Sequence, residues 1–372
     1  MTGTASDVVI IGAGIVGAAC AWSLARERIP VRVLECGVPG GGATAAGMGH
    51  LVLMDQPEAE YALTRYSRDL WLALAPEIPP EGEFRRCGTI WVAAGAEEFE
   101  AARAKHAWYS ARGLRSELLD GAALASAEPN LRPGLAGGLL VPDDAIIYAP
   151  CVVRWLLERS GAALLSGVRA VAVDRSGVVT AAGGHIPCGT VVCATGCEAA
   201  ALLPGLPLRP RKGHLAITDR YPGFVHHQLA ELGYLKSAHG ASRESVAFNV
   251  QPRATGQVLL GSSRQFGDER PQVAWPVLAR MIRHAAQFMP ALGRLSVTRV
   301  WTGFRAATED GLPLIGPYGD TGNLILATGH EGLGITTALA TGELVAAHVL
   351  GRRPAIPAAP YLPSRIGART HV

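Results

Sequence analysis

The chain has 372 residues, enough for about two domains with a large buried core. Its net charge is only +3 and no basic run alternates with aromatic residues, which argues against nucleic-acid binding. No stretch reaches the roughly 18 apolar residues of a membrane span, and the amino-terminal apolar stretch lacks the basic segment of a signal peptide. With 45 glycines and 49% hydrophobic residues, the composition favours an α/β enzyme with tight turns at a ligand.

The seven cysteines are odd in number, and no two of them form a Cys-x-x-Cys pair. Cys193 and Cys197 lie close in the sequence, but no further Cys or His completes a metal-binding set. This pattern is typical of small buried residues in a reducing compartment, so we expect no metal and no iron–sulfur cluster. It predicts a cytoplasmic protein, with peripheral attachment to the inner membrane as the alternative.

The first 35 residues carry the clearest motif. A short β-branched run at 8–11 predicts a central parallel strand, the Ala-rich segment that follows predicts a helix, and the apolar run at 31–34 predicts a second strand. Three glycines in GxGxxG spacing separate the first strand from the helix. Gly12 allows a tight turn, Gly14 lets the backbone approach a pyrophosphate, and Gly17 lets helix and strand pack closely.

The second strand ends on Glu35, about 18 residues after Gly17, near the ~20 expected for the acid that accepts ribose hydroxyls. An acid there disfavours the 2′-phosphate of NADP. Ile15 and Val16 open the helix, whose amides and positive dipole end would face the phosphates. The order of these features favours dinucleotide binding over a βαβ unit without a nucleotide, but the motif alone does not separate FAD from NAD.

The segment 37–51 is rich in Gly and Ala, so it could lie against a large planar ligand; a flexible loop is the alternative. His50 is its one titratable group and could face the substrate or be structural. Next come a helix at 61–74 and an excursion that interrupts the nucleotide domain. The excursion comprises a strand at 84–94, helices at 96–112 and 120–128, and a strand at 137–142.

The chain then returns to the nucleotide domain. Its expected elements are a helix at 150–159, strands at 163–168 and 169–174, and a strand at 190–196 that ends on small residues. A strand ending on small residues is typical of the place where backbone approaches a cofactor. A second excursion begins at 208–218 and continues with strands at 246–251 and 257–261 and a helix at 277–289.

The block 300–349 contains a second strand, glycine-rich turn and helix. The apolar strand is expected at 324–327, the turn at 329–334 and the helix at 336–350. Two such units far apart in the sequence indicate a cofactor held from both ends of the chain. FAD is long enough to require this, which is the main reason for preferring FAD to NAD.

With both ends of the chain considered, the sequence resembles the D-amino-acid oxidase/glycine oxidase family of FAD-dependent oxidoreductases over nearly its whole length. The matching motifs are Gly12, Gly14 and Gly17 with Glu35, the loop 42–48, Ala194-Thr195-Gly196, the segment 210–213, Gly303-Phe304-Arg305 with 308–313, and the turn 329–334.

The resemblance implies an α/β fold with a Rossmann-like FAD-binding domain of the GR2 type and an interleaved α+β substrate domain. The FAD-binding domain would be assembled from residues 1–83, 142–214 and 302–356. The substrate-binding domain would comprise residues 84–141 and 215–301, followed by a carboxy-terminal tail at 357–372.

The resemblance also implies the FAD contacts. The ADP half would be held by Gly12, Gly14, Ile15, Val16, Gly17 and Glu35, with Val168 meeting the adenine through its backbone. The ribityl and flavin would be met by Thr44, Ala45, Gly47, Met48, Thr195, Gly196, Gly329, His330, Gly332, Leu333, Gly334, Ile335 and Thr336. Relatives with covalent flavin carry a cysteine at the position of Gly303, so FAD should be non-covalent here.

By the same resemblance, Arg305 would pair with the substrate carboxylate. A planar guanidinium forms two parallel bonds with a carboxylate and cannot lose its charge. No dedicated base is required if the substrate binds with a free amine. His50 and His330 are the histidines to test as proton acceptors.

Within the family, the continuation at 47–52 is most similar to the FAD subunits of heteromeric bacterial dehydrogenases, such as the β subunit of D-hydroxyproline dehydrogenase. This implies oxidation of the C–N bond of a D-imino or D-amino acid, with cis-4-hydroxy-D-proline giving 1-pyrroline-4-hydroxy-2-carboxylate by hydride transfer to flavin N5. The electron acceptor would be an additional dehydrogenase subunit or a quinone.

Two other functions stay open. One is an oxygen-dependent oxidase of glycine, sarcosine or another D-amino acid, although Asn249 stands where such oxidases place a tyrosine over the substrate. The other is a non-catalytic FAD-binding subunit that scaffolds a complex. NAD-dependent dehydrogenation is the least favoured.

Overall fold

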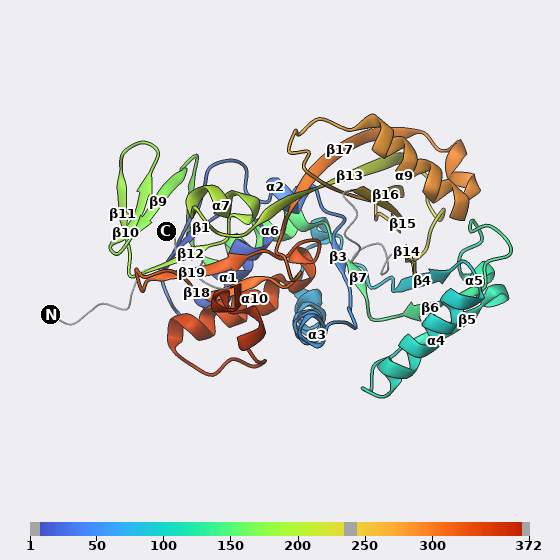
Figure 1. Cartoon of the computed structure of the whole chain (residues 1–372), viewed down its shortest axis with the longest axis horizontal. Helices are drawn as coiled ribbons and strands as arrows, with labels where there is room; N and C mark the ends of the chain where they lie inside the picture. The colour runs from blue at the N-terminus through green and yellow to red at the C-terminus, as the bar shows by residue number, and fades with distance from the viewer. Residues whose placement is uncertain (1–7, 234–243, 367–372) are drawn as a thin grey trace. The chain divides into compact units, whose positions relative to one another are not determined.

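In the computed structural model, the amino-terminal apolar run forms strand β1 (Val8–Ile11), and all four of its residues are buried. The structure describes residues 8–233 and 244–366 (Figure 1). They divide into two units. Unit 1 contains residues from Met1–Gly82, Tyr148–Pro210 and Phe304–Val372, and unit 2 contains residues from Glu83–Ile147 and Arg211–Gly303. The assignment of an FAD-binding and a substrate-binding domain to particular segments stays a prediction. Residues 1–7 and 367–372, which this prediction also assigns, lie outside the described residues.

Unit 1 contains a six-stranded sheet with β1 near its middle. Its strands, in spatial order, are β18 (Leu314–Pro317), β19 (Leu324–Thr328), β12 (Thr190–Cys193), β1, β2 (Val31–Glu35) and β8 (Ala163–Ser166). Every pairing is parallel except that of β18 with β19. A mostly parallel sheet with helical crossovers confirms the expected α/β class.

The helices of unit 1 are α1 (Ile15–Arg26), α2 (Gly42–Ala45), α3 (Glu58–Leu74), α6 (Ala149–Ser160), α7 (Ala199–Leu202) and α10 (Gly334–Leu350). Unit 1 also has the short strand β3 (His50–Leu51) and a small sheet of β9 (Ala170–Asp174), β10 (Gly177–Thr180) and β11 (His185–Pro187). Its 3-10 helices are Ala75–Glu77, Pro80–Gly82, Gly196–Glu198, Ala359–Tyr361 and Pro363–Ile366. None of the helices in the described ranges is both long and apolar enough to cross a membrane.

Helices α1 and α10 approach each other closely because Gly342 has no side chain. A Cβ atom on Gly342 would lie 2.6 Å from the Ala19 carbonyl oxygen and 2.7 Å from Ser23 Oγ. Both helices carry an almost continuous run of buried small and apolar residues. The contact fixes the helices that follow the two glycine-rich turns against one another.

Unit 2 contains an eight-stranded sheet. Its strands, in spatial order, are β17 (Val297–Ala307), β13 (Arg209–Arg220), β16 (Gln257–Phe266), β15 (Glu244–Pro252), β14 (Gln228–Glu231), β4 (Thr89–Ala93), β6 (Gly137–Val141) and β5 (Glu117–Asp120). The remaining elements are β7 (Ala145–Ile146), helices α4 (Ala96–Ser110), α5 (Gly121–Ala127) and α9 (Trp275–Phe288), and the 3-10 helix Pro290–Arg294.

One face of this sheet forms an apolar core. Ile90, Leu229, Phe248 and Val250 are fully buried in one cluster with residues of α9. The rings of Phe248 and Phe288 stack with their centroids 4.6 Å apart. Because side chains alternate along a strand, the residues between these apolar positions belong to the opposite face.

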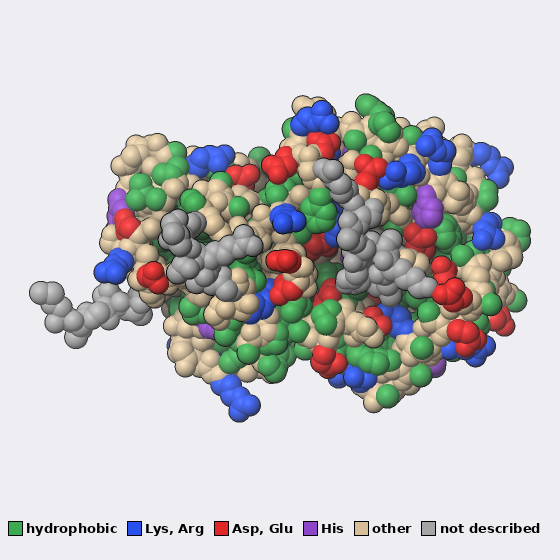
Figure 2. All heavy atoms as spheres, viewed as in Figure 1, with side chains coloured by type: hydrophobic (Ala, Val, Ile, Leu, Met, Phe, Trp, Pro, Cys, Tyr) green, Lys and Arg blue, Asp and Glu red, His purple; other side chains and the backbone are tan. Residues whose placement is uncertain are grey.

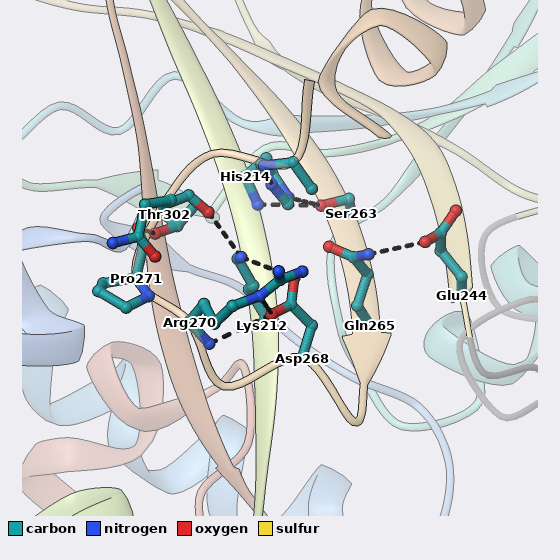
Figure 3. Close-up of polar contacts among 11 residues, drawn as sticks. Lys212, His214, Glu244, Ser263, Gln265, Asp268, Arg270, Pro271 and Thr302 are labelled. Atoms are coloured by element: carbon teal, nitrogen blue, oxygen red, sulfur yellow. Dashed lines mark hydrogen bonds and ion pairs between the residues drawn. The ribbon is translucent and has the colours of Figure 1, made fainter. Parts of the chain in front are cut away.

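A polar network fixes the connection between β16 and α9 to strand β13 (Figure 3). The buried Lys212 ammonium donates to Asp268 Oδ2 at 3.0 Å and to the Gln272 carbonyl at 2.6 Å. The Ala274 amide donates to His214 Nε2, so the ring proton is on Nδ1 and faces Ser263 Oγ at 2.9 Å. Arg270 and Lys212 together hold the pKa of the Asp268 carboxyl below its ordinary value.

Some expected elements differ from the structure. The strand expected at 84–94 begins only at Thr89. Before it, Arg85 pairs with Ile146 in an isolated antiparallel bridge. The strand expected at 190–196 ends at Cys193, after which the chain turns. Strands that were not expected from the sequence include β3, β5, β7, β10, β11, β14, β17 and β18. Most of them are only three or four residues long, too short for a periodic signal.

The α1–α10 contact predicts the effect of Gly342→Ala. Alanine favours a helix by about 1 kcal/mol over glycine, but its methyl group would overlap the α1 backbone, and overpacking costs about 1–3 kcal/mol. We expect a net destabilisation of about 1–2 kcal/mol in urea unfolding. Gly293→Ala is the control, because nothing lies within 4 Å of its Cβ position. Equal or greater stability of Gly342→Ala would contradict the close contact.

Candidate functional site

The first glycine-rich turn is shaped by backbone contacts. Gly12 has a φ of +102°, and a Cβ atom on it would lie 2.6 Å from the Ala194 carbonyl oxygen. A Cβ atom on Gly17 would lie 1.9 Å from the Gly12 carbonyl oxygen. Gly14 differs, because its Cβ would meet only Thr44 Oγ1 at 3.3 Å. Gly12 and Gly17 are therefore required by backbone contacts, whereas a Cβ atom on Gly14 would meet only one side-chain atom.

The Glu35 carboxylate lies beside this turn. Its Oε2 accepts a hydrogen bond from the Ala13 amide at 2.8 Å, and its Oε1 accepts one from the Gly37 amide at 2.7 Å. The Glu35 carbonyl accepts from the Val168 amide at 3.0 Å. The structure thus brings together the expected ribose-binding acid, the glycine turn and the expected adenine-binding residue.

Thr44 connects the loop after β2 to the same turn. Its Oγ1 accepts a hydrogen bond from the Ile15 amide at 3.0 Å, and its side chain is buried. Ala45, which ends α2, is exposed, as is Gly42 at the start of that helix. Val16, the second residue of α1, is half-buried.

The same loop also reaches the second glycine-rich turn. A Cβ atom on Gly47 would lie 2.9 Å from Ile335 Cδ1. Thr336 Oγ1 donates to the His50 carbonyl at 2.8 Å. The indole of Trp71 donates to the carbonyls of Ile335 and Thr336. Met48 lies between Gly47 and His50 in the sequence, and both of these neighbours contact the start of α10.

The second turn lies next to Arg305. The Glu331 amide donates to the Ala306 carbonyl at 2.9 Å, and a Cβ atom on Gly332 would lie 3.6 Å from Arg305 Nε. Gly332 therefore lies directly beside the Arg305 side chain. Gly329, with φ +78°, would meet Thr308 Cγ2 at 2.8 Å if it carried a Cβ.

His330 is buried in this turn as a neutral imidazole. Thr341 donates its hydroxyl proton to the Thr337 carbonyl, so His330 Nε2 donates to Thr341 Oγ1 at 3.0 Å. Burial lowers the pKa of His330 to about 4. At neutral pH the ring is therefore uncharged, with its proton on Nε2.

The end of β12 joins the same region. Thr195 precedes the 3-10 helix that begins at Gly196, and the Gly196 carbonyl accepts from Thr328 Oγ1 at 3.0 Å. Thr328 is the last residue of β19 and directly precedes the second turn. The expected contacts from three distant segments of unit 1 thus meet at the carboxyl ends of neighbouring parallel strands, where α/β proteins bind ligands.

These residues fit FAD. Neither Gly14, which precedes α1, nor Leu333, which precedes α10, supplies a side-chain cap; since the Ile15 amide donates to Thr44, the later first-turn amides of α1 and the first-turn amides of α10 are the ones that could face an anionic or electron-rich ligand. Neither helix carries an acidic residue in its first turn. In the described part of the chain, no group of three or more His, Cys, Asp or Glu side chains could hold a metal ion.

Unit 2, described by itself, carries a set of buried polar residues that the sequence analysis missed apart from Asn249. We call Thr89, Gln228, Asn249 and Gln251 the polar face; all four are buried. They alternate with apolar core residues on β4, β14 and β15, and this period of two was the available signal.

On the face shown in Figure 2, Lys and Arg side chains lie among acidic ones without a continuous basic surface.

Comparison with known proteins gives a consistent result. The sequence matches the family described as DAO: FAD dependent oxidoreductase over residues 7–348. Glycine oxidase of Geobacillus kaustophilus is 28% identical over 95% of this chain and 96% of its own length. The crystal structure of that glycine oxidase has a TM-score of 0.87 at 26% identity, with 99% of both chains covered.

Two further relatives carry different names. The hydrogen cyanide synthase subunit HcnC of Pseudomonas aeruginosa is 26% identical, with 96% of both chains covered. The D-amino acid dehydrogenase of Xanthobacter autotrophicus is 27% identical over 94% of this chain and 96% of its own length. The similarity to each relative thus extends over nearly the whole chain.

Because a Cβ atom on Gly14 would meet only Thr44 Oγ1, and no backbone atom, we expect Gly14→Ala to affect cofactor binding more than folding. The methyl group would block the approach of the pyrophosphate and cost one or two hydrogen bonds to a charged group, worth about 1.5–3 kcal/mol each. We expect FAD affinity to fall about 10- to 100-fold in a flavin-fluorescence titration, with the free energy of unfolding of the flavin-free protein nearly unchanged. Wild-type FAD affinity in this variant would contradict the assignment.

The buried neutral His330 predicts a pH-dependent stability. Its pKa of about 4 in the folded state lies below the ordinary value near 6.5, so the unfolded chain binds more protons between these two values. The free energy of unfolding should therefore fall by about 3 kcal/mol through this site as the pH is lowered from 7 to 4. Urea unfolding of His330→Gln should lack this component, while the exposed His226→Gln keeps it. Identical pH profiles of wild type and His330→Gln would be inconsistent with a buried neutral ring.

Proposed function

This chain belongs to the DAO family of FAD-dependent oxidoreductases, and we propose from that premise that it oxidises the C–N bond of a D-imino or D-amino acid. The proposed substrate is cis-4-hydroxy-D-proline, and the product is 1-pyrroline-4-hydroxy-2-carboxylate. Relatives named glycine oxidase and D-amino acid dehydrogenase support an amino-acid substrate. The choice of a hydroxylated D-proline follows the resemblance at residues 47–52.

The observation that carries the proposal is the position of Arg305 against the second glycine-rich turn. A Cβ atom on Gly332 would lie 3.6 Å from Arg305 Nε, so the second glycine-rich turn passes directly beside the Arg305 side chain. A guanidinium pairs with a carboxylate through two parallel hydrogen bonds and stays charged at any physiological pH. Arg305 would hold the substrate carboxylate and so orient the Cα–H bond.

Catalysis then depends mainly on positioning. When bound, FAD supplies the two-electron acceptor for the hydride that leaves the substrate Cα. As the C–H bond breaks, the amine lone pair forms the C=N bond and the N–H proton leaves to solvent or to His50. Correct orientation of the reacting groups contributes up to ~7–11 kcal/mol. His330 keeps a neutral ring in the turn, so it adds no positive charge there at neutral pH.

The proposed electron acceptor is a second dehydrogenase subunit or a quinone. Support comes from the relative HcnC, whose name describes a subunit of hydrogen cyanide synthase. We propose a cytoplasmic location on the basis of the cysteine pattern.

An oxygen-dependent glycine or sarcosine oxidase is the second candidate function. The similarity to glycine oxidase supports it, and Asn249 at the position of the expected tyrosine opposes it.

Replacement of Arg305 tests this proposal. Arg305→Leu should keep a normal flavin spectrum but lower kcat/KM about 100-fold or more, because hydrogen bonds to a charged group contribute about 1.5–3 kcal/mol each. The measurement is anaerobic flavin reduction by cis-4-hydroxy-D-proline in a stopped-flow instrument. Arg299→Leu, which removes an exposed arginine from the same strand, is the matched control.

Two outcomes would contradict the proposal. If Arg305→Leu is reduced at the wild-type rate, Arg305 does not hold the carboxylate. If the wild-type flavin is reduced by no amino acid at all, the protein is not an amino-acid oxidoreductase, and a scaffold subunit becomes the better description.

A further inference from the structure

A small pocket lies in unit 2 beside the turn that joins β15 to β16. Its walls include Arg85, Tyr221, Val225, Pro252, Arg253 and Val258, all of them residues of unit 2. It has about 310 Å³ of free space, part of which is open to solvent. Ligand pockets in proteins have volumes of ~300–1,000 Å³, so this one suits a small molecule and not a nucleotide.

Hydrogen bonds of the backbone hold the walls of the pocket in place. The Tyr221 amide donates to the Gly256 carbonyl at 2.7 Å, which joins the segment 221–226 to the β15–β16 turn. At the other end of that segment, the His226 amide donates to the buried carboxylate of Glu128 at 2.9 Å. The pocket is therefore formed by the fold itself and needs no ligand to shape it.

Arg85 is the charged group that the pocket offers to a ligand. Two backbone hydrogen bonds with Ile146, both at 3.0 Å, fix its main chain. Its Nη2 donates to the His226 carbonyl at 3.2 Å, which holds the guanidinium at the pocket wall. Among the residues that the structure describes, Arg85 forms no ion pair, whereas its neighbour Arg86 pairs with Asp143.

The second arginine of the pocket is already neutralised. Arg253 donates from Nε and Nη2 to the two oxygens of the Glu83 carboxylate, each at 2.8 Å. Two parallel bonds between a guanidinium and a carboxylate form one of the stronger charge-assisted pairs. Of the two arginines, only Arg85 thus offers an uncompensated positive charge, which suits a ligand with a single negative charge.

Apolar side chains make up another part of the wall. Val225, Pro252 and Val258 line the pocket and are buried. A phosphate ion, which is polar on all sides, would leave oxygen atoms unpaired against these side chains, and unpaired buried polar groups are costly. A carboxylic acid with a short alkyl body can instead place its carboxylate at Arg85 and its alkyl group against the apolar wall.

Tyr221 can supply a second hydrogen bond. Its hydroxyl oxygen accepts from the Ser296 amide at 3.0 Å, so the hydroxyl proton is left for another acceptor. Within the described residues no acceptor for that proton is found. A carboxylate oxygen accepts such a bond strongly because it is charged.

We propose that this pocket binds a small monocarboxylic acid through Arg85 and Tyr221, in addition to the substrate of the proposed oxidation. Its walls contain no residue of unit 1, to which Arg305 belongs. The site therefore goes beyond the proposed function and does not depend on it.

The test is a titration with isobutyrate, followed by saturation-transfer NMR of its methyl protons. It uses the Arg305→Leu holoenzyme, so that the proposed substrate site contributes no carboxylate binding, and adds one pocket substitution at a time. We expect saturable binding that Arg85→Gln and Tyr221→Phe each weaken about 10-fold, because each removes a hydrogen bond to a charged group. Arg86→Gln, which removes the neighbouring arginine outside the pocket, is the matched control and should bind isobutyrate unchanged.

Two further ligands test the chemical class. Acetate lacks two of the carbon atoms of isobutyrate and should bind about 10-fold more weakly, because less apolar surface is buried. Phosphate that binds as tightly as isobutyrate would overturn the choice of a carboxylic acid.

The inference is overturned if isobutyrate shows no saturable binding, or if Arg85→Gln and Arg86→Gln bind it equally well. None of these results depends on flavin reduction by an amino acid. The failure of this inference and the failure of the proposed function are therefore distinguishable.

Discussion

The structure of unit 1 depends on the absence of side chains at two positions in the first glycine-rich turn. A Cβ atom on Gly17 would overlap the Gly12 carbonyl oxygen, and one on Gly12 would overlap the Ala194 carbonyl oxygen. These contacts join β1, α1 and β12 at the backbone level. They bring the amino end of α1 to the carboxyl edge of the sheet, where Glu35 and Val168 also lie. The dinucleotide site follows from this packing.

Two threonine hydroxyls extend that arrangement. Thr44 accepts from the Ile15 amide at the start of α1, and Thr336 donates to the His50 carbonyl at the start of α10. The loop between β2 and β3 therefore bridges the first turns of two helices that are more than three hundred residues apart in sequence. The residues that precede these helices, Gly14 and Leu333, supply no side-chain cap, and Thr44 takes only the Ile15 amide, so further first-turn amides could face a long dinucleotide.

The sequence predicted the parts in which local signals and the fold agree. The β-branched run at 8–11, the glycine spacing and Glu35 predicted β1, α1 and β2 because each signal lies within a few residues of the others. Short strands such as β14 gave no periodic signal, since four residues fit several patterns. The sequence offered no reason to single out Gln228 and Thr89, because their burial on one sheet face depends on the pairing of strands that are distant in sequence. Asn249 was noticed only through the resemblance.

The most direct test of the central claim is anaerobic mixing of the purified flavoprotein with cis-4-hydroxy-D-proline, D-proline, sarcosine and glycine, followed by admission of air. Flavin absorbance near its visible maximum reports reduction and reoxidation. We expect bleaching by the two D-prolines and slow recovery in air, as for a dehydrogenase that passes electrons to a partner or a quinone. Bleaching only by glycine or sarcosine, with rapid recovery in air, would contradict the central claim and identify an oxidase.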